Sequence, residues 1–148
     1  HFYSDNNSAM RRSVWKEHPY PEIPYGEDQV WARDIIEEGR VKLYAPTATV
    51  YHSHDYDPEE TFARARTESA FFLEHFGYVL GSDDVDEMEA AIAREQALFR
   101  HRARPGKFAP DALDRQIANI EAKHRGWRAG RVGAPSHLQT DNPIGTTA

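Results

Sequence analysis

Residues 25–39 read YGEDQVWARDIIEEG, and this stretch predicts the first helix of the chain. Three apolar side chains recur on one side of it at helical spacing: Val30, Trp31 and Ile35. Gly26 allows a tight turn at the start, and a second glycine closes the stretch, so we predict a helix over residues 27–38. Glu27 and Asp28 then occupy the first turn of that helix.

Three more helices are predicted further along the chain, each from a start or stop signal and an apolar stripe. One begins at Asp57-Pro58, where a capping side chain precedes a proline and two acids, and Gly77 closes it. The next follows Asp84 and ends before an Arg-Pro-Gly breaker. The last begins near Pro110 and is expected to end at Gly126.

Two runs between the first two helices are rich in β-branched and aromatic residues, and Pro46 separates them. Residues 41–45 and 47–52 therefore read as short strands, and residues 2–4 as another edge of the same sheet. The expected fold of this chain is mostly α-helical with two or three short strands. Strand edges without partners present unpaired backbone groups, so we also expect exposed apolar surface and self-association.

Length, charge and composition limit the class of protein. The chain has 148 residues, a mass of 16.9 kDa and a net charge of −6, which is enough for one domain with a hydrophobic core. It has no cysteine, which excludes disulfides and thiolate sites, and no apolar run is long enough to span a membrane. Residues 57–100 hold 4 basic and 11 acidic side chains, and this acidic middle argues against nucleic-acid binding.

The acidic pair Glu27 and Asp28 has two interpretations. Acids in the first turn of a helix complement its dipole and bond its free N–H groups, which is a purely structural role. Alternatively, the turn at Gly26 holds one carboxylate at the mouth of a cleft as a general base. Spacing alone leaves both interpretations open.

His52 and His54 form the second candidate site. Two residues apart on a strand, both imidazoles would point to the same face, which suits metal ligation or a joint grip on an anion. Asp55 adds an oxygen ligand within reach, so a small metal-binding protein that uses these three residues is one hypothesis. The alternative is a polar strand end with one histidine hydrogen-bonded to backbone.

Small polar side chains fill SDNNS at residues 4–8, which include Asp5 and Asn7. They offer donors and acceptors that suit sugar hydroxyls, although a loop and a helix cap contain the same residue types. Arg11 and Arg12 follow, and two adjacent guanidinium groups can clamp a diphosphate. The alternative for this pair is an ordinary solvated surface.

Several segments, in this order, resemble the family 2 glycosyltransferases, most closely the rhamnosyltransferase-like bacterial members. They are SDNNSAMRRSVW from residue 4, YGEDQVWARDIIEEG from residue 25, KLYAPTATVYHSH from residue 42, and the phenylalanine-rich helix that follows. The resemblance covers about residues 1–80. It implies a GT-A fold, which is an α/β architecture, for the complete enzyme.

The resemblance implies an inverting sugar transfer. Asp28, with Glu27 beside it, would be the catalytic base that accepts the proton of an acceptor hydroxyl. That oxygen would attack the anomeric carbon of a nucleotide-sugar donor in a single displacement and release a nucleoside diphosphate. The acceptor would be a saccharide, and the pathway would be polysaccharide biosynthesis.

The remaining candidates receive supporting roles from the resemblance. A divalent Mg or Mn ion would stabilise the leaving diphosphate, and His52 or His54 would help to bind it. Asp5 and Asn7 would lie near the sugar or the acceptor. Trp31 would pack below the base.

The donor-binding half of the family, with its Asp-x-Asp metal motif, has no counterpart before Glu27. The chain is therefore expected to be the C-terminal part of such an enzyme, inactive alone, and located in the cytoplasm or at the inner face of the membrane. Residues 1–80 would form the acceptor and base side, residues 81–130 a helical extension, and residues 131–148 a flexible tail. The alternative is a non-catalytic helical interaction module in which the acidic pair and the histidine pair are structural.

Overall fold

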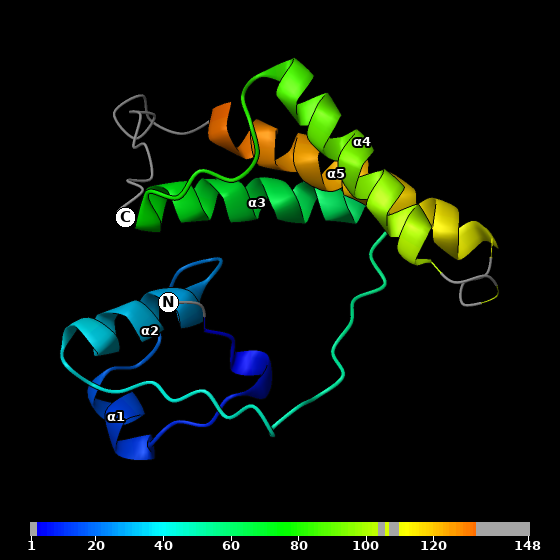
Figure 1. Ribbon diagram of the computed structural model, residues 1–148. Coiled ribbons are helices and arrows are strands. Elements are labelled where there is room, and N and C mark those ends of the chain that lie inside the picture. Colours follow the sequence, from blue (N-terminus) through cyan, green and yellow to red (C-terminus); the bar gives the residue numbers. More distant parts are fainter. Residues whose placement is uncertain (1–2, 104–105, 107–109, 133–148) are drawn as a thin grey trace, which may run out of the picture. The chain divides into compact units, whose positions relative to one another are not determined.

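The computed structural model describes residues 3–103, 106 and 110–132, which form two compact units that divide between Asp55 and Tyr56 (Figure 1). The predicted, mostly helical character of the chain is confirmed. The helical elements are η1 Asp5–Asn7, α1 Arg12–Glu17, α2 Glu27–Glu37, α3 Pro58–Phe76, α4 Val85–Arg102 and α5 Pro110–Val132.

In the first unit, α2 begins where the sequence predicts and supplies the core. Gly26 takes a left-handed φ of 71°, and its carbonyl oxygen accepts the first bonds of the helix. Val30, Trp31 and Ala32 are buried. The Trp31 Nε1 donates to the His18 carbonyl oxygen at 2.6 Å, so the helix is tied to the segment that follows α1.

Helix α1 is an addition to the predicted elements, and ion pairs join its end to the end of α2. Arg40 contacts Glu17 at 2.6 Å, and His18 contacts Glu38 at 3.0 Å. These side chains are partly exposed, so each pair contributes at most about 1 kcal/mol. The pairs therefore orient a short helix of six residues rather than supply most of its stability.

The predicted strands at 41–45, 47–52 and 2–4 are wrong for the residues that the structure describes, where no strand occurs; residue 2 lies outside them. Pro46 instead lies in a turn that the Ala48 N–H closes on the Ala45 carbonyl oxygen at 3.1 Å. A strand needs a neighbour for its backbone bonds, and these runs have none in the described unit. Apolar side chains with high relative exposure follow: Val41 81%, Leu43 86%, Tyr44 89% and Tyr51 110%. The expected exposed apolar surface is thus confirmed, while self-association stays a prediction.

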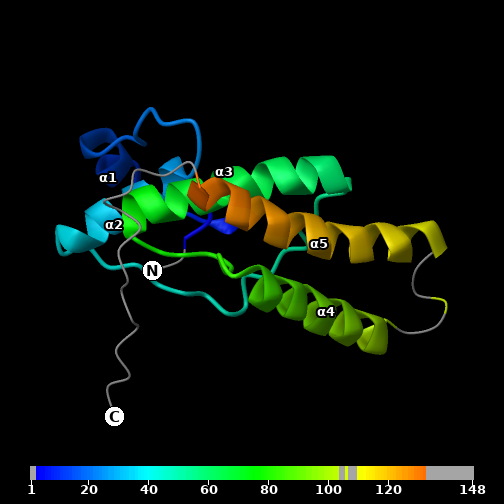
Figure 2. The same ribbon diagram turned by 90° about the horizontal axis from the view of Figure 1, so that it is seen from above.

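In the second unit, α3 and α5 lie side by side and run in the same direction (Figures 1 and 2). Helix α3 begins and ends as predicted. The Asp57 side chain and the N3 residue Glu60 form a reciprocal capping box, and Gly77 ends the helix with a φ of 67°. These local signals were readable because each satisfies free backbone groups at a helix end.

The predicted end of the last helix at Gly126 is wrong, because α5 continues to Val132. Gly126 and Gly130 lie one turn apart where α5 crosses α3, opposite Ala65 and Ser69. A Cβ atom at Gly126 would lie 2.5 Å from the Phe62 carbonyl oxygen, so only glycine permits this approach of two backbones. The glycine that reads as a stop signal is therefore a packing residue.

Helix α4 runs antiparallel to α5 (Figure 2), and several polar side chains form contacts between the two helices. Glu95 lies at the centre, 2.5 Å from the Lys123 Nζ and 2.9 Å from the His124 Nε2. On either side, Arg125 contacts Glu89 at 3.0 Å, and the Gln96 amide donates to the Ile117 carbonyl oxygen at 3.1 Å. Among the apolar residues of α4, Met88 and Ile92 are buried.

The position of Glu95 predicts a pH-dependent stability. Burial acts to raise the pKa of Glu95, but hydrogen bonds from Lys123 and His124 outweigh it and hold that pKa below 4.5. A lowered folded-state pKa contributes stability above the unfolded value, and this stability is lost as the pH falls through the folded one. Urea unfolding should show Glu95→Gln to be less stable than the wild type at pH 7, by about 1 kcal/mol or less because the site is partly exposed. As the pH falls below 4.5 the difference should shrink, and a difference independent of pH would contradict the prediction.

The predicted domain boundary at residue 80 is the point where the family resemblance ends, and it stays a prediction. The structure divides instead after residue 55, because the residues on each side of that point pack mainly within their own unit. Residues 133–148 of the predicted tail lie outside the described residues, and residues 131 and 132 belong to α5. Within the described ranges, no helix is both long and apolar enough to cross a membrane.

Candidate active site around Asp28

Asp28 lies in the first turn of α2 and is half-buried. Its Oδ2 accepts a hydrogen bond from the Asp5 backbone N–H at 3.2 Å, and the Gln29 backbone N–H also donates to this carboxylate. Both predicted acids, Glu27 and Asp28, thus lie at the helix start, but among the residues that the structure describes a distant segment is hydrogen-bonded to Asp28 rather than to Glu27. This asymmetry makes Asp28 the functional candidate of the two.

The environment of Asp28 raises its pKa above the ordinary value of 3.8. Burial is the main cause, and repulsion from the carboxylates of Asp5 and Glu27 adds to it. The two backbone hydrogen bonds act in the opposite direction and are outweighed. Asp28 therefore holds a proton more tightly than a solvated aspartate, which is the property that a general base needs.

Three aromatic residues, Tyr3, Tyr20 and Trp31, pack against one another in the same unit. The Trp31 ring is 4% exposed and lies 5.7 Å from the Tyr3 ring and 5.4 Å from the Tyr20 ring, measured between centroids. The Tyr3 hydroxyl donates to the Ser8 Oγ at 2.8 Å. Burial, followed by a hydrogen bond with Tyr3, raises the pKa of the Tyr20 hydroxyl, and the negative charge of Asp28 adds to the shift. The Tyr20 hydroxyl thus remains protonated at neutral pH.

Asp5 and Asn7 belong to the short helix η1, which the Ser4 side chain caps by accepting from the Asn6 N–H at 3.4 Å. Asp5 uses its backbone, not its carboxylate, to contact Asp28. The Asn7 side-chain amide donates to the Ala48 carbonyl oxygen at 2.5 Å, which links η1 to the segment that precedes the histidine pair. The structure thus brings Asp5 to Asp28, while Asn7 contacts the segment at Ala48.

Three further predicted residues lie at different places in the first unit. Trp31 is buried against Tyr3 and Tyr20, which leaves its indole almost no surface for a ligand, and its packing below Asp28 stays a prediction. Arg11 precedes α1 and Arg12 begins it; both are exposed. In the described part of the chain, no hydrogen bond joins either guanidinium to the groups around Asp28, so their role as a diphosphate clamp stays a prediction.

His52 and His54 lie in an exposed, irregular segment rather than on a strand. Their Nε2 atoms are nevertheless 2.9 Å apart and their rings meet edge to face, with centroids 4.5 Å apart. Among the described residues, no group of three or more histidine, aspartate or glutamate side chains is placed to hold a metal ion. The pair can therefore supply two ligands, and the hypothesis of a small metal-binding protein that adds Asp55 gains no support.

Tyr3, Tyr20 and Gln29 are parts of the site that sequence reasoning missed. Gln29 accepts from the Tyr3 backbone N–H through its Oε1 at 3.2 Å. The contacts that bring them together, Tyr3 with Gln29 and both tyrosines with Trp31, join residues more than ten apart in the sequence, so no local pattern marks them. The only available signal was the aromatic residue in the proline-rich approach, Pro19-Tyr20-Pro21.

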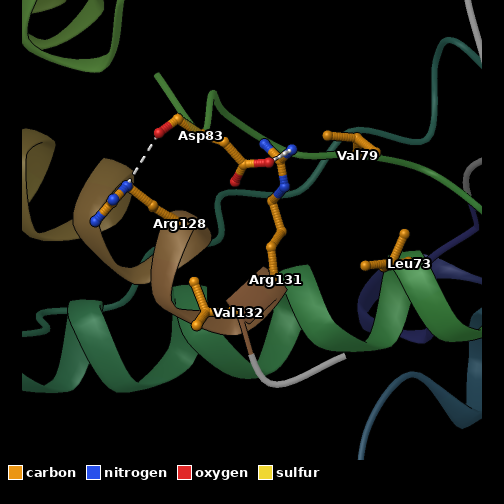
Figure 3. Close-up of a pocket in the computed structure, with 6 residues that line it drawn as sticks. All are labelled: Leu73, Val79, Asp83, Arg128, Arg131 and Val132. Atoms are coloured by element: carbon orange, nitrogen blue, oxygen red, sulfur yellow. Dashed lines mark hydrogen bonds and ion pairs between the residues drawn. The ribbon is translucent and has the colours of Figure 1, made fainter. Parts of the chain in front are cut away.

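A separate pocket in the second unit lies at the C-terminal end of α5 (Figure 3). Its lining residues are Leu73, Val79, Asp83, Arg128, Arg131 and Val132. The Asp83 carboxylate pairs with Arg131, and the Arg128 Nε donates to the Asp83 carbonyl oxygen at 3.3 Å. Arg131 also donates to the Gly81 carbonyl oxygen at 3.1 Å. These bonds fasten the α3–α4 connection to α5, which is a structural role.

Comparison with known proteins supports a relationship for part of the chain. A segment of 65 residues, 43% of this chain, is 40% identical to the O-antigen chain rhamnosyltransferase RfbN of Salmonella typhimurium. The segment covers 21% of that protein, so the chain spans about a fifth of the length of the relative that it matches. No family model matches the chain, and no solved structure matches it. The chain is thus glycosyltransferase-like over this segment.

Proposed function

We propose that this chain forms the acceptor and base side of an inverting sugar transferase, in which Asp28 is the general base. The observation that carries the proposal is the half-buried Asp28 carboxylate, whose pKa is raised and which a backbone N–H from Asp5 orients. The partial similarity to a rhamnosyltransferase supports the choice of reaction class. A raised proton affinity improves a carboxylate as a base for an alcohol.

The proposed reaction is a single displacement between a nucleotide-sugar donor and a saccharide hydroxyl. The hydroxyl oxygen attacks the anomeric carbon from the face opposite the leaving group, and a new C–O bond forms. The bond between that carbon and the diphosphate oxygen breaks, and the diphosphate takes its electron pair. The hydroxyl proton passes to Asp28, so no positive charge remains on the attacking oxygen. The anomeric configuration inverts because the attack comes from the face opposite the leaving group.

The histidine pair fits a supporting role at the diphosphate. The Nε2 atoms of His52 and His54 lie at hydrogen-bond distance from each other, 2.9 Å, so the two imidazoles would hold a divalent ion together once neither Nε2 carries a proton. A bound divalent ion would supply positive charge for the leaving diphosphate. The remaining ligands would come from the diphosphate, from water and from other parts of the protein.

The test is a transfer assay with the natural full-length protein. With a nucleoside diphosphate rhamnose and a panel of saccharide acceptors, we expect a glycosidic product whose anomeric configuration, read by NMR, is opposite to that of the donor. Chelation of divalent ions should lower the rate by at least about 100-fold, and Mg or Mn should restore it, since such an ion contributes several kcal/mol to charge stabilisation.

The outcome also decides between this function and the non-catalytic alternative. Absence of transfer with every nucleotide-sugar tested, in a protein shown to be folded by circular dichroism, would contradict the proposal. It would favour a helical interaction module, in which α3, α4 and α5 are the working part. Product with retained configuration would reject Asp28 as the base of a single displacement.

A further inference from the structure

The segment of residues 3–5 is fixed to the first turn of α2 by a pair of hydrogen bonds. The Tyr3 N–H donates to the Gln29 Oε1 at 3.2 Å, and the Asp5 N–H donates to the Asp28 Oδ2 at 3.2 Å. Ser4 between them is extended, with φ −144° and ψ 131°. In an extended chain, alternate N–H groups point to the same side, so both donors face the helix start together.

Ring packing holds the same segment from another direction. The Tyr3 ring lies on the buried Trp31, one turn further along α2. Residues 3–5 therefore contact α2 at three places: the Asp28 carboxylate, the Gln29 amide and the Trp31 ring. Of these, Gln29 is the one polar side chain that is not itself the proposed base, because Trp31 contributes packing.

We propose that Gln29 is a positioning residue for the base: by holding the Tyr3 N–H, it keeps the Asp5 N–H on the Asp28 carboxylate and fixes the direction in which Asp28 meets the acceptor hydroxyl. This inference rests on the proposed function of Asp28. Without the Gln29 oxygen, residues 3–5 keep the Asp5 bond and the ring contact as their links to α2, and the Asp5 N–H loses the neighbouring bond that fixes its position. The Asp28 carboxylate is then held firmly by the Gln29 backbone N–H alone and is freer to turn about its side-chain torsions.

A first experiment tests the coupling without any assay of activity. In the 148-residue chain, the amide proton resonance of Asp5 should move as Asp28 ionises, because that proton is bonded to the carboxylate. Gln29→Leu should abolish this titration step, whereas Gln29→Glu, which keeps an acceptor oxygen at the same position, should retain it. Asp5, Glu27 and Tyr20 also face Asp28, so the assignment is checked by its loss in Asp28→Asn.

A second experiment tests the consequence for the reaction in the natural full-length protein. Gln29→Leu should lower kcat by about 10- to 100-fold, with the KM for the nucleotide-sugar within about twofold, because a small misplacement of a reacting group is costly. Gln29→Glu should retain most of kcat. It should also move the acidic limb of the pH profile upward, since it adds a like charge beside Asp28.

The outcomes separate the inference from the function on which it rests. Full activity of Asp28→Asn would reject the proposed base and the positioning role with it, although the Asp5 amide of the wild-type chain would still report the ionisation of Asp28. An inactive Asp28→Asn together with wild-type kcat and pH profile in Gln29→Leu would overturn the positioning role alone. Loss of kcat in both Gln29 variants would also overturn it, because the conservative variant then fails to rescue.

Discussion

In the natural full-length protein, replacement of Asp28 by Asn is expected to lower kcat of the proposed sugar transfer by about 10²- to 10⁴-fold, the usual contribution of a general base. The amide has the shape of the carboxylate, and its oxygen can still accept the Asp5 N–H, so the site keeps its form. It cannot take the proton of the acceptor hydroxyl. The KM for the nucleotide-sugar should change little, because the lost interaction develops only in the transition state.

Two control variants test whether the loss of activity is specific to Asp28. Asp34→Asn makes the same chemical change on an exposed position of α2, and it should leave kcat within about twofold, since it lies on the surface away from the base. Glu27→Gln should lower activity much less than Asp28→Asn, because the Glu27 carboxylate contributes only repulsion to the site. Equal losses in both acidic positions would contradict the assignment of Asp28.

Asp28→Asn should raise the stability of the folded chain although it lowers activity. Because the pKa of Asp28 is raised on folding, its contribution to stability is fully present below pH 3.8 and is lost as the pH rises through the folded value. Asp28→Asn removes this loss, so the variant should be somewhat more stable than the wild type at neutral pH. A buried carboxylate that lowers stability and has a raised pKa is characteristic of functional sites.

How much of the fold the sequence predicts depends on whether the deciding interaction is local. Asp57 and Glu60 satisfy backbone groups within one turn, and Gly77 ends the same helix by its own left-handed conformation, so α3 was predicted correctly. Gly126 carries the same chemical signal as Gly77, yet α5 continues through it. What distinguishes the two glycines is the backbone of α3 beside Gly126, and no pattern within α5 encodes that neighbour.

In the candidate site, too, the local interactions were predictable from the sequence and the long-range ones were not. The turn at Gly26 and the acids after it are local, and they placed Asp28 correctly at the start of α2. The bond between Tyr3 and Gln29 joins residues 26 apart, so only the folded chain shows it. The strand prediction for residues 41–52 was wrong for a related reason. High strand propensity indicates side chains that pack well in a sheet, and the described unit provides no neighbouring strand.

The glycines of α5 lead to the second large effect, on stability. Gly126→Ala and Gly130→Ala together are expected to destabilise the second unit by about 2–4 kcal/mol, measured by urea unfolding. At Gly126 the added Cβ would lie 2.5 Å from the Phe62 carbonyl oxygen and 2.8 Å from the Ala65 Cβ. At Gly130 it would meet the Arg66 carbonyl oxygen, and the Ser69 Cβ at 2.9 Å. Backbone atoms cannot move aside as a flexible side chain can, so α3 and α5 must separate.

The sign of this effect is the decisive result, because helix propensity predicts the reverse. Alanine in a helix interior is favoured over glycine by about 1 kcal/mol, so an unpacked α5 would gain stability from both substitutions. Ala97→Gly on the exposed face of α4 provides the scale of that preference in this chain, with an expected loss of about 1 kcal/mol. If the double alanine variant were as stable as the wild type or more stable, the close crossing of α3 and α5 would be disproved. A loss larger than the Ala97→Gly effect would show that contact between the two backbones, rather than propensity, makes glycine necessary at both positions.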